Sequence, residues 1–110
     1  MLATSPANFE FRLDPYNECL LRGSEEYPLR PKTYAVLQQL VSRAGQLVTK
    51  SQLLDSVWSD SYVSDMVLKV SIHELRKVLE DDPRKPRYIQ TRHGRGYRFI
   101  GRLVVVEPPE

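Results

Sequence analysis

The last third of the chain carries basic residues interleaved with aromatic ones, and its side chains are a first candidate for a functional surface. Residues 84–102 contain seven Lys or Arg residues in 19 positions and no Asp or Glu. Tyr88, His93, Tyr97 and Phe99 lie among these cations. This composition is typical of a surface that faces phosphate groups. Charge alone leaves a solvated basic hairpin as an equally good interpretation.

A second candidate surface lies on a helix that the hydrophobic periodicity predicts over residues 64–80. At 100° per residue, Leu68, Ile72, Leu75 and Leu79 share one face, which predicts a core stripe. The opposite face is polar and largely basic, and it carries Met66, Lys69, His73, Arg76, Lys77 and Glu80, with Val70 and Glu74 at its edge. An α-helix fits the major groove of B-DNA, so this face could present cations to base edges. An ordinary surface network with the neighbouring glutamates is the plainer interpretation.

The segments before this helix predict a small sheet and two shorter helices. Residues 9–13 alternate apolar and polar, and further extended pieces are expected at residues 19–22 and 27–29, which together indicate an antiparallel meander. Pro31 suits the first turn of a helix, and Gly45 suits the position just after its end. A capping-box pattern at Thr49 and Gln52 then begins a second helix, with Leu53, Leu54, Val57 and Trp58 as its apolar face.

A basic hairpin is expected after the long helix. Pro83 ends that helix, because proline disfavours a helical residue before it. Residues 88–91 and 97–100 alternate as strands do, and the loop 92–96 between them contains two glycines. We therefore expect residues 1–103 to form one domain and residues 104–110, which contain Pro108-Pro109, to begin a linker or tail.

Several other classes of protein do not fit. Cys19 is the only cysteine, so neither a disulfide scaffold nor a cysteine-based zinc site is expected. No apolar run approaches the roughly 20 residues of a membrane span, and the N-terminus lacks the order of a signal peptide, which indicates a cytoplasmic location. His73-Glu74 lacks the second histidine of a zinc protease, because position 77 is lysine. The glycines at 94 and 96 do not precede a helix, so no nucleotide loop is formed. We expect no enzyme activity, cofactor, metal or small-molecule substrate.

Strands, three helices and a basic hairpin in this order predict an α+β fold, a winged helix-turn-helix. Several runs also resemble the OmpR/PhoB-type winged-helix family: residues 29–37, 45–50, 53–58, 70–79 and 91–99. Leu75-Arg76-Lys77 followed by Gly96-Tyr97-Arg98-Phe99 is the most specific part. Asp81-Asp82-Pro83, with residues 86–89, is more similar to the ToxR/CadC-like branch, which lacks a receiver domain.

The resemblance implies a four-stranded N-terminal sheet, three helices, a C-terminal hairpin and sequence-specific binding to double-stranded promoter DNA by a transcriptional regulator. It implies head-to-tail protomers on direct repeats, with RNA polymerase as a further candidate partner. Carried over by position, the base contacts are Met66, Lys69, Val70, His73 and Glu74. The phosphate contacts are Trp58, Ser71, Arg76, Lys77, Thr91 and Tyr97, and the wing contacts at the minor groove are Arg92, His93 and Arg95.

The chain departs from the family pattern at three of these positions. Met66 and His93 each stand where arginine is frequent, and Ser71 stands where histidine is frequent. Two further positions have alternative interpretations: Trp58 could belong to the core, and Glu74 could pair with Lys77 instead of accepting from cytosine N4. The operator sequence therefore cannot be transferred from a relative.

Two other functions compete with sequence-specific binding. A winged helix can serve as a protein-interaction module, but its exposed helix face should then carry large apolar anchors. Non-specific architectural binding to DNA or RNA predicts the same affinity for every sequence.

Overall fold

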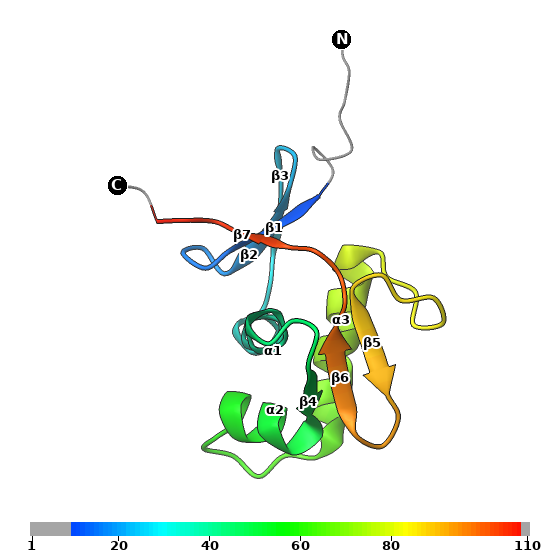
Figure 1. Cartoon of the computed structure of the whole chain (residues 1–110). Coiled ribbons are helices and arrows are strands. Elements are labelled where there is room, and N and C mark those ends of the chain that lie inside the picture. Colours follow the sequence, from blue (N-terminus) through cyan, green and yellow to red (C-terminus); the bar gives the residue numbers. More distant parts are fainter. Residues whose placement is uncertain (1–9, 109–110) are drawn as a thin grey trace.

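The alternating N-terminal sequence forms strands in the computed structural model, which describes residues 10–108. The first expected strand is observed at Phe11–Asp14; Phe9 lies outside the described residues. The elements in chain order are β1 (Phe11–Asp14), β2 (Cys19–Arg22), β3 (Glu25–Pro28), α1 (Pro31–Ser42), β4 (Leu47–Thr49), α2 (Lys50–Val57), α3 (Asp65–Leu79), β5 (Ile89–Arg92), β6 (Gly96–Phe99) and β7 (Val104–Val105). The expected α+β winged-helix fold is confirmed (Figure 1).

Two sheets lie on either side of the helices (Figure 1). In the first sheet the strand order is β3-β2-β1-β7, and the second sheet has the order β4-β6-β5. The first three strands of the chain pair antiparallel, as expected, but the fourth strand of their sheet is β7, which runs parallel to β1. The resemblance implied a four-stranded sheet at the N-terminus; here the C-terminal end of the chain supplies the fourth strand.

This pairing involves residues from the segment expected to begin a linker or tail. Val104 and Val105 pair with Arg12 and Leu13, and the backbone N–H of Val106 donates to the carbonyl of Leu13 at 2.8 Å. Residues 104–106 are therefore bound to the edge of the first sheet. Backbone hydrogen bonds to an open strand edge favour this extension over a free linker.

The helix ends follow local capping rules in two cases and depart from them in one. Thr49 and Gln52 form the expected capping box at the start of α2. The side chain of Ser64 accepts the N–H of Met66 at the start of α3. However, α1 ends at Ser42, earlier than we expected from Gly45. Gly45 instead has a φ of +83° in the following turn, where its N–H donates to the carbonyl of Phe99 at 2.8 Å.

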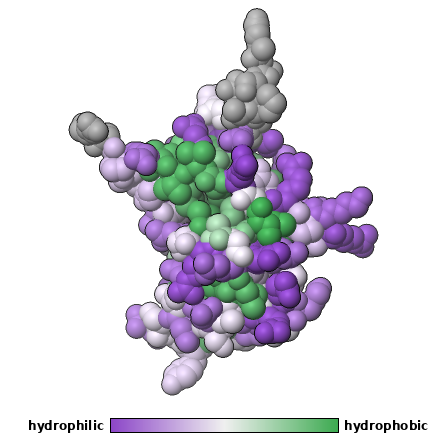
Figure 2. Space-filling model, in the orientation of Figure 1, coloured by the Kyte–Doolittle hydropathy of each residue, from purple (hydrophilic) through white to green (hydrophobic). Residues whose placement is uncertain are grey.

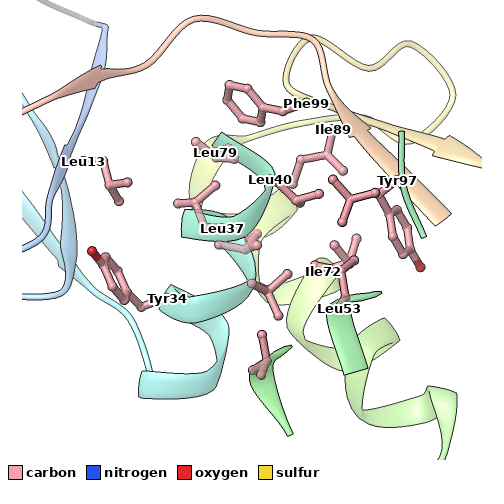
Figure 3. Close-up of a cluster of buried hydrophobic side chains, with 14 of the residues drawn as sticks. Leu13, Tyr34, Leu37, Leu40, Leu53, Ile72, Leu79, Ile89, Tyr97 and Phe99 are labelled. Atoms are coloured by element: carbon pink, nitrogen blue, oxygen red, sulfur yellow. The ribbon is translucent and has the colours of Figure 1, made fainter. Parts of the chain in front are cut away.

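One core joins the helices to both sheets (Figure 3). The predicted stripe of α3 is confirmed, since all four of its side chains are at most 2% exposed. Leu37 and Leu40 of α1 and Leu53 of α2 pack in the same cluster as this stripe. Ile89 and Phe99 add the hairpin to it. Burial of this apolar surface, at about 25 cal/mol per Å², holds the hairpin against α3.

Candidate nucleic-acid interface

The exposed side of α3 forms a ridge that is separate from the core stripe. Met66, Val70, His73 and Lys77 follow one another at intervals of three or four residues, and all four are exposed. Residues with this spacing lie on one face of a helix. The predicted outer face of the helix is therefore open to a partner, as the candidate interface requires.

A groove runs between this helix and the hairpin. It has a volume of about 620 Å³. Seven of the predicted site residues line it, four from α3 and three from the hairpin: Lys69, His73, Arg76, Lys77, Thr91, His93 and Tyr97. The two segments that the sequence analysis singled out separately are thus brought to one surface, with Lys69, Arg76 and Lys77 on the helix wall and His93 on the hairpin wall.

Arg76 connects the two walls. Its Nη2 donates to the carbonyl oxygen of Ile89 at 2.9 Å and to Oγ1 of Thr91 at 2.8 Å. The side chain is half-buried, and its Nε has no hydrogen-bond partner among the described residues. Hydrogen bonds from a charged donor contribute more than neutral ones, about 1.5–3 kcal/mol. Arg76 therefore holds β5 against α3 in addition to lining the groove.

The tip of the hairpin is held in place by backbone contacts. The N–H of Arg95 donates to the carbonyl of Arg92 at 2.9 Å, and Gly94 takes a φ of +73° in this turn. The carbonyl of Arg95 accepts from the N–H of Lys50, at the start of α2, at 3.1 Å. Arg92, His93 and Arg95 are all exposed. The predicted wing therefore presents three basic side chains from an anchored turn.

The base of the hairpin depends on a buried carboxylate. Glu80 ends α3 in the left-handed conformation, with a φ of 56°. Asp81, next in the chain, is buried, and its carboxylate accepts backbone N–H groups of Arg87, Tyr88 and Ile89, the shortest at 2.7 Å. The loop between α3 and β5 is thus tied back to the start of β5. Sequence reasoning did not assign this role to Asp81.

Hydrophilic side chains surround this loop on the molecular surface. Figure 2 shows them projecting from the loop between α3 and β5 and along β5, while an apolar patch covers the region of β1 and β7. Val104 and Val105 are exposed in β7. The polar surface beside α3 and the apolar surface over the first sheet are therefore different parts of the molecule.

Tyr97 and Trp58 contribute to both the core and the surface. Tyr97 is 6% exposed, and burial raises the pKa of its phenol, although the Arg76 guanidinium acts in the opposite direction. Its ring belongs to the core cluster, and the phenol oxygen points away from that cluster (Figure 3). Trp58 is half-buried and packs against the core from the end of α2. Each ring is held by packing, and each borders a surface groove.

Ser71 lies where α3 packs against α1. Its side chain is buried, and its Oγ lies 3.4 Å from Oγ1 of Thr33. Ser71 also lines a surface trough between α3 and the start of α1, beside Arg30 and Lys32. Its hydroxyl serves the α1–α3 contact, and the phosphate contact expected from it stays a prediction.

Glu74, expected as a base contact with pairing to Lys77 as the alternative, has partners on the side of α1. Its carboxylate accepts from Oγ1 of Thr33 at 2.6 Å and forms an ion pair with Arg30 at 2.8 Å. The Thr33 hydrogen bond, followed by the Arg30 contacts, lowers the pKa of Glu74 below its usual value. These bonds turn the carboxylate toward α1. The base contact expected from Glu74 stays a prediction.

Two basic residues at the start of α1 were not predicted as site residues from the sequence. Arg30 and Lys32 line a second trough, on the other side of α3, together with Trp58, Met66, Val67 and Val70. The ammonium group of Lys32 donates to the carbonyl of Val57 at 2.7 Å. The only signal in the sequence was a basic residue on either side of Pro31. The helix crossing that brings them beside α3 is a tertiary feature.

Two negative observations limit the chemistry of the part that the structure describes. Between residues 10 and 108, no three His, Cys, Asp or Glu side chains are grouped as ligands of a metal ion. No helix of that region is both long enough and apolar enough to cross a bilayer.

A helix with an open basic face, fixed to a basic hairpin and packed on two shorter helices, defines a winged-helix DNA-binding domain. The chain belongs to the family described as "Transcriptional regulatory protein, C terminal", whose model matches residues 24–99. This family is the OmpR/PhoB type of winged-helix domain.

Most of the chain is similar to bacterial transcriptional regulators. The chain is 46% identical over 90 residues to the transcriptional regulator HilA of Salmonella typhimurium, covering 82% of this chain and 16% of HilA. It is 40% identical over 80 residues to the KDP operon regulatory protein KdpE of Escherichia coli, covering 72% of this chain and 36% of KdpE. The chain thus spans well under half the length of these relatives.

Solved structures show the same fold. The DNA-binding domain of Klebsiella pneumoniae RstA, in complex with the RstA box, superposes with a TM-score of 0.72 at 30% identity, covering 83% of this chain and 91% of that one. The DNA-binding domain of Escherichia coli CadC gives a TM-score of 0.71 at 29% identity, covering 91% and 96%. The expected relationship to OmpR/PhoB-type and CadC-like domains is confirmed.

Proposed function

We propose that this chain binds duplex DNA sequence-specifically for a transcriptional regulator, with α3 in the major groove and the wing tip at the adjacent minor groove. The observation that carries the proposal is the groove in which Lys69 and His73 of α3 face His93 and Tyr97 of the hairpin. An α-helix fits the major groove, and a cation at a narrow minor groove is favoured electrostatically. The complex of the related RstA domain with its DNA box supports this interpretation.

The residues divide into two roles. Side chains on the ridge and at its edge face base edges in this arrangement: Met66, Lys69, Val70 and His73. Side chains on the flanks and the wing face the backbone and the minor groove: Trp58, Arg76, Lys77, Thr91, Arg92, His93, Arg95 and Tyr97. Base contacts provide specificity, while backbone contacts provide position and most of the salt dependence.

The finer expectations on partners and location belong to the same proposal. We place the domain in the cytoplasm, acting on direct repeats as head-to-tail protomers, with RNA polymerase as a further partner and with no enzyme activity. The exposed Val104 and Val105 of β7 do not line the basic groove, which leaves them available for a second protein contact.

The proposal is tested by selecting bound duplexes from a random pool with the 110-residue chain. Fluorescence anisotropy then compares the selected duplex with a scrambled one at about 50–200 mM salt, where phosphate contacts are evident. We expect the selected duplex to bind at least about 10³-fold more tightly. Equal affinities would indicate architectural binding, and no binding even at low salt would favour the protein-interaction module.

A further inference from the structure

Two apolar side chains interrupt the polar ridge of α3. Met66 is 61% exposed and Val70 is 43% exposed, and they lie one helical turn apart. A single exposed apolar residue is ordinary on a protein surface. Here the two are adjacent, and with Trp58 and Val67 they line the same trough of about 540 Å³. The first two turns of α3 therefore expose a continuous apolar strip.

Cations border this strip on both sides. On the hairpin side, Lys69 lines the groove from α3, and Arg92 lies exposed on the wing. On the other side, Arg30 and Lys32 line the trough from the start of α1. An apolar centre between two cationic flanks matches the major groove, where base edges form the floor and phosphates form both rims.

The major-groove floor offers few apolar groups. The edges of guanine, cytosine and adenine present hydrogen-bond donors and acceptors there, while thymine presents its C5-methyl group. A protein partner would be expected to find larger anchors on the helix, such as exposed aromatic residues. On the exposed ridge, only a methionine and a valine are apolar.

We infer that Met66 and Val70 contact the C5-methyl groups of thymine, so that the preferred duplex carries thymine in the base pairs beneath the first two turns of α3. The inference rests on the proposed function and specifies its base preference. Removing a methyl group from a buried contact costs about fourfold in affinity.

The test replaces each thymine of the selected duplex, one at a time, with deoxyuridine. Uracil keeps the hydrogen-bonding groups of thymine and lacks only the methyl group. We expect about fourfold weaker binding at each methyl-contact position and no change at the others. At the position that Val70 contacts, the Val70→Ala variant should bind the thymine and uracil duplexes equally. Met66→Gln should do the same at the position that Met66 contacts. Both side chains are exposed, so neither variant should unfold the domain.

The matched control is Ile100→Ala, which removes an exposed apolar side chain just after β6 that lines neither the groove nor the trough. It should discriminate thymine from uracil as the unchanged chain does. The inference is overturned if the selected duplex binds equally well with every thymine replaced, or if both α3 variants retain the full discrimination. In either case a clear preference for the selected over the scrambled duplex would leave the proposed function intact.

Discussion

Nη2 of Arg76 and Oγ1 of Thr91 lie 2.8 Å apart, and this hydrogen bond joins α3 to the first strand of the wing. The same Nη2 also donates to the carbonyl of Ile89. The angle between the helix and the hairpin is thus fixed by a charged side chain within the groove as well as by the core. The surface is organised before DNA arrives, which lowers the entropic cost of binding.

Arg76→Ala should therefore reduce both stability and DNA affinity. Losing the bonds to β5 should lower the free energy of unfolding by about 1–3 kcal/mol, measured by urea denaturation. All duplexes should bind more weakly, with the salt slope reduced by about one unit. Lys77→Ala is the matched control: it should reduce the slope similarly and change stability by less than about 0.5 kcal/mol. Equal stability of the two variants would contradict the linking role of Arg76.

His73→Ala should act on specificity. His73 is exposed at the centre of the ridge, so its loss should relax the preference at one or two base pairs by about 1–3 kcal/mol each. The measurement is the affinity of the variant for the selected duplex and for a set with single base-pair changes. A uniform loss over the whole set would identify His73 as a backbone contact instead.

The two glycines of the wing should respond differently to alanine. A Cβ at Gly96 would lie 2.1 Å from the carbonyl oxygen of Val48, so Gly96→Ala should separate β6 from β4 and lower the melting temperature strongly. A Cβ at Gly94 meets nothing within 4 Å, and only its positive φ opposes the substitution, at about 1 kcal/mol. Thermal unfolding of the two variants checks this order. Similar melting temperatures would show that the close approach of β6 to β4 is not maintained in solution.

Glu74 should make stability depend on pH. Its pKa is lower in the folded chain, first through the Thr33 hydrogen bond and then through Arg30, so its contribution is complete above the ordinary value of 4.5 and is lost as pH falls through the folded pKa. Glu74→Gln retains an acceptor for Thr33 and removes the charge. The difference in unfolding free energy between the unchanged chain and this variant should shrink from pH 6 to pH 3. A difference that does not vary with pH would show that the Arg30 pair is not formed in solution.

The sequence predicted those features that depend on neighbours along the chain. The apolar stripe of α3 and the Thr49–Gln52 capping box follow from spacing alone, and both are present. The basic groove was also foreseeable, because a winged-helix order places the hairpin beside the third helix. Periodicity and capping act over three or four residues, so they are visible without a structure.

The features that it did not predict depend on contacts between distant segments. The pairing of β7 with β1 joins residues about 90 positions apart in the sequence, and the Arg30–Glu74 ion pair depends on how α1 crosses α3. Ser71 could have been recognised as buried, because it lies on the helix between Leu68 and Leu75, three positions before and four positions after it. The resemblance assigned it to phosphate, and that contact stays a prediction.

The most direct test of the proposed binding surface is a titration of the ¹⁵N-labelled chain with the selected duplex, followed by amide chemical shifts. We predict large changes on α3 from Met66 to Lys77 and at residues 92–95 of the wing. Residues of β1, β2 and β3 should change little, because they lie on the other side of the helices. Changes concentrated on that first sheet, with α3 unaffected, would contradict the account.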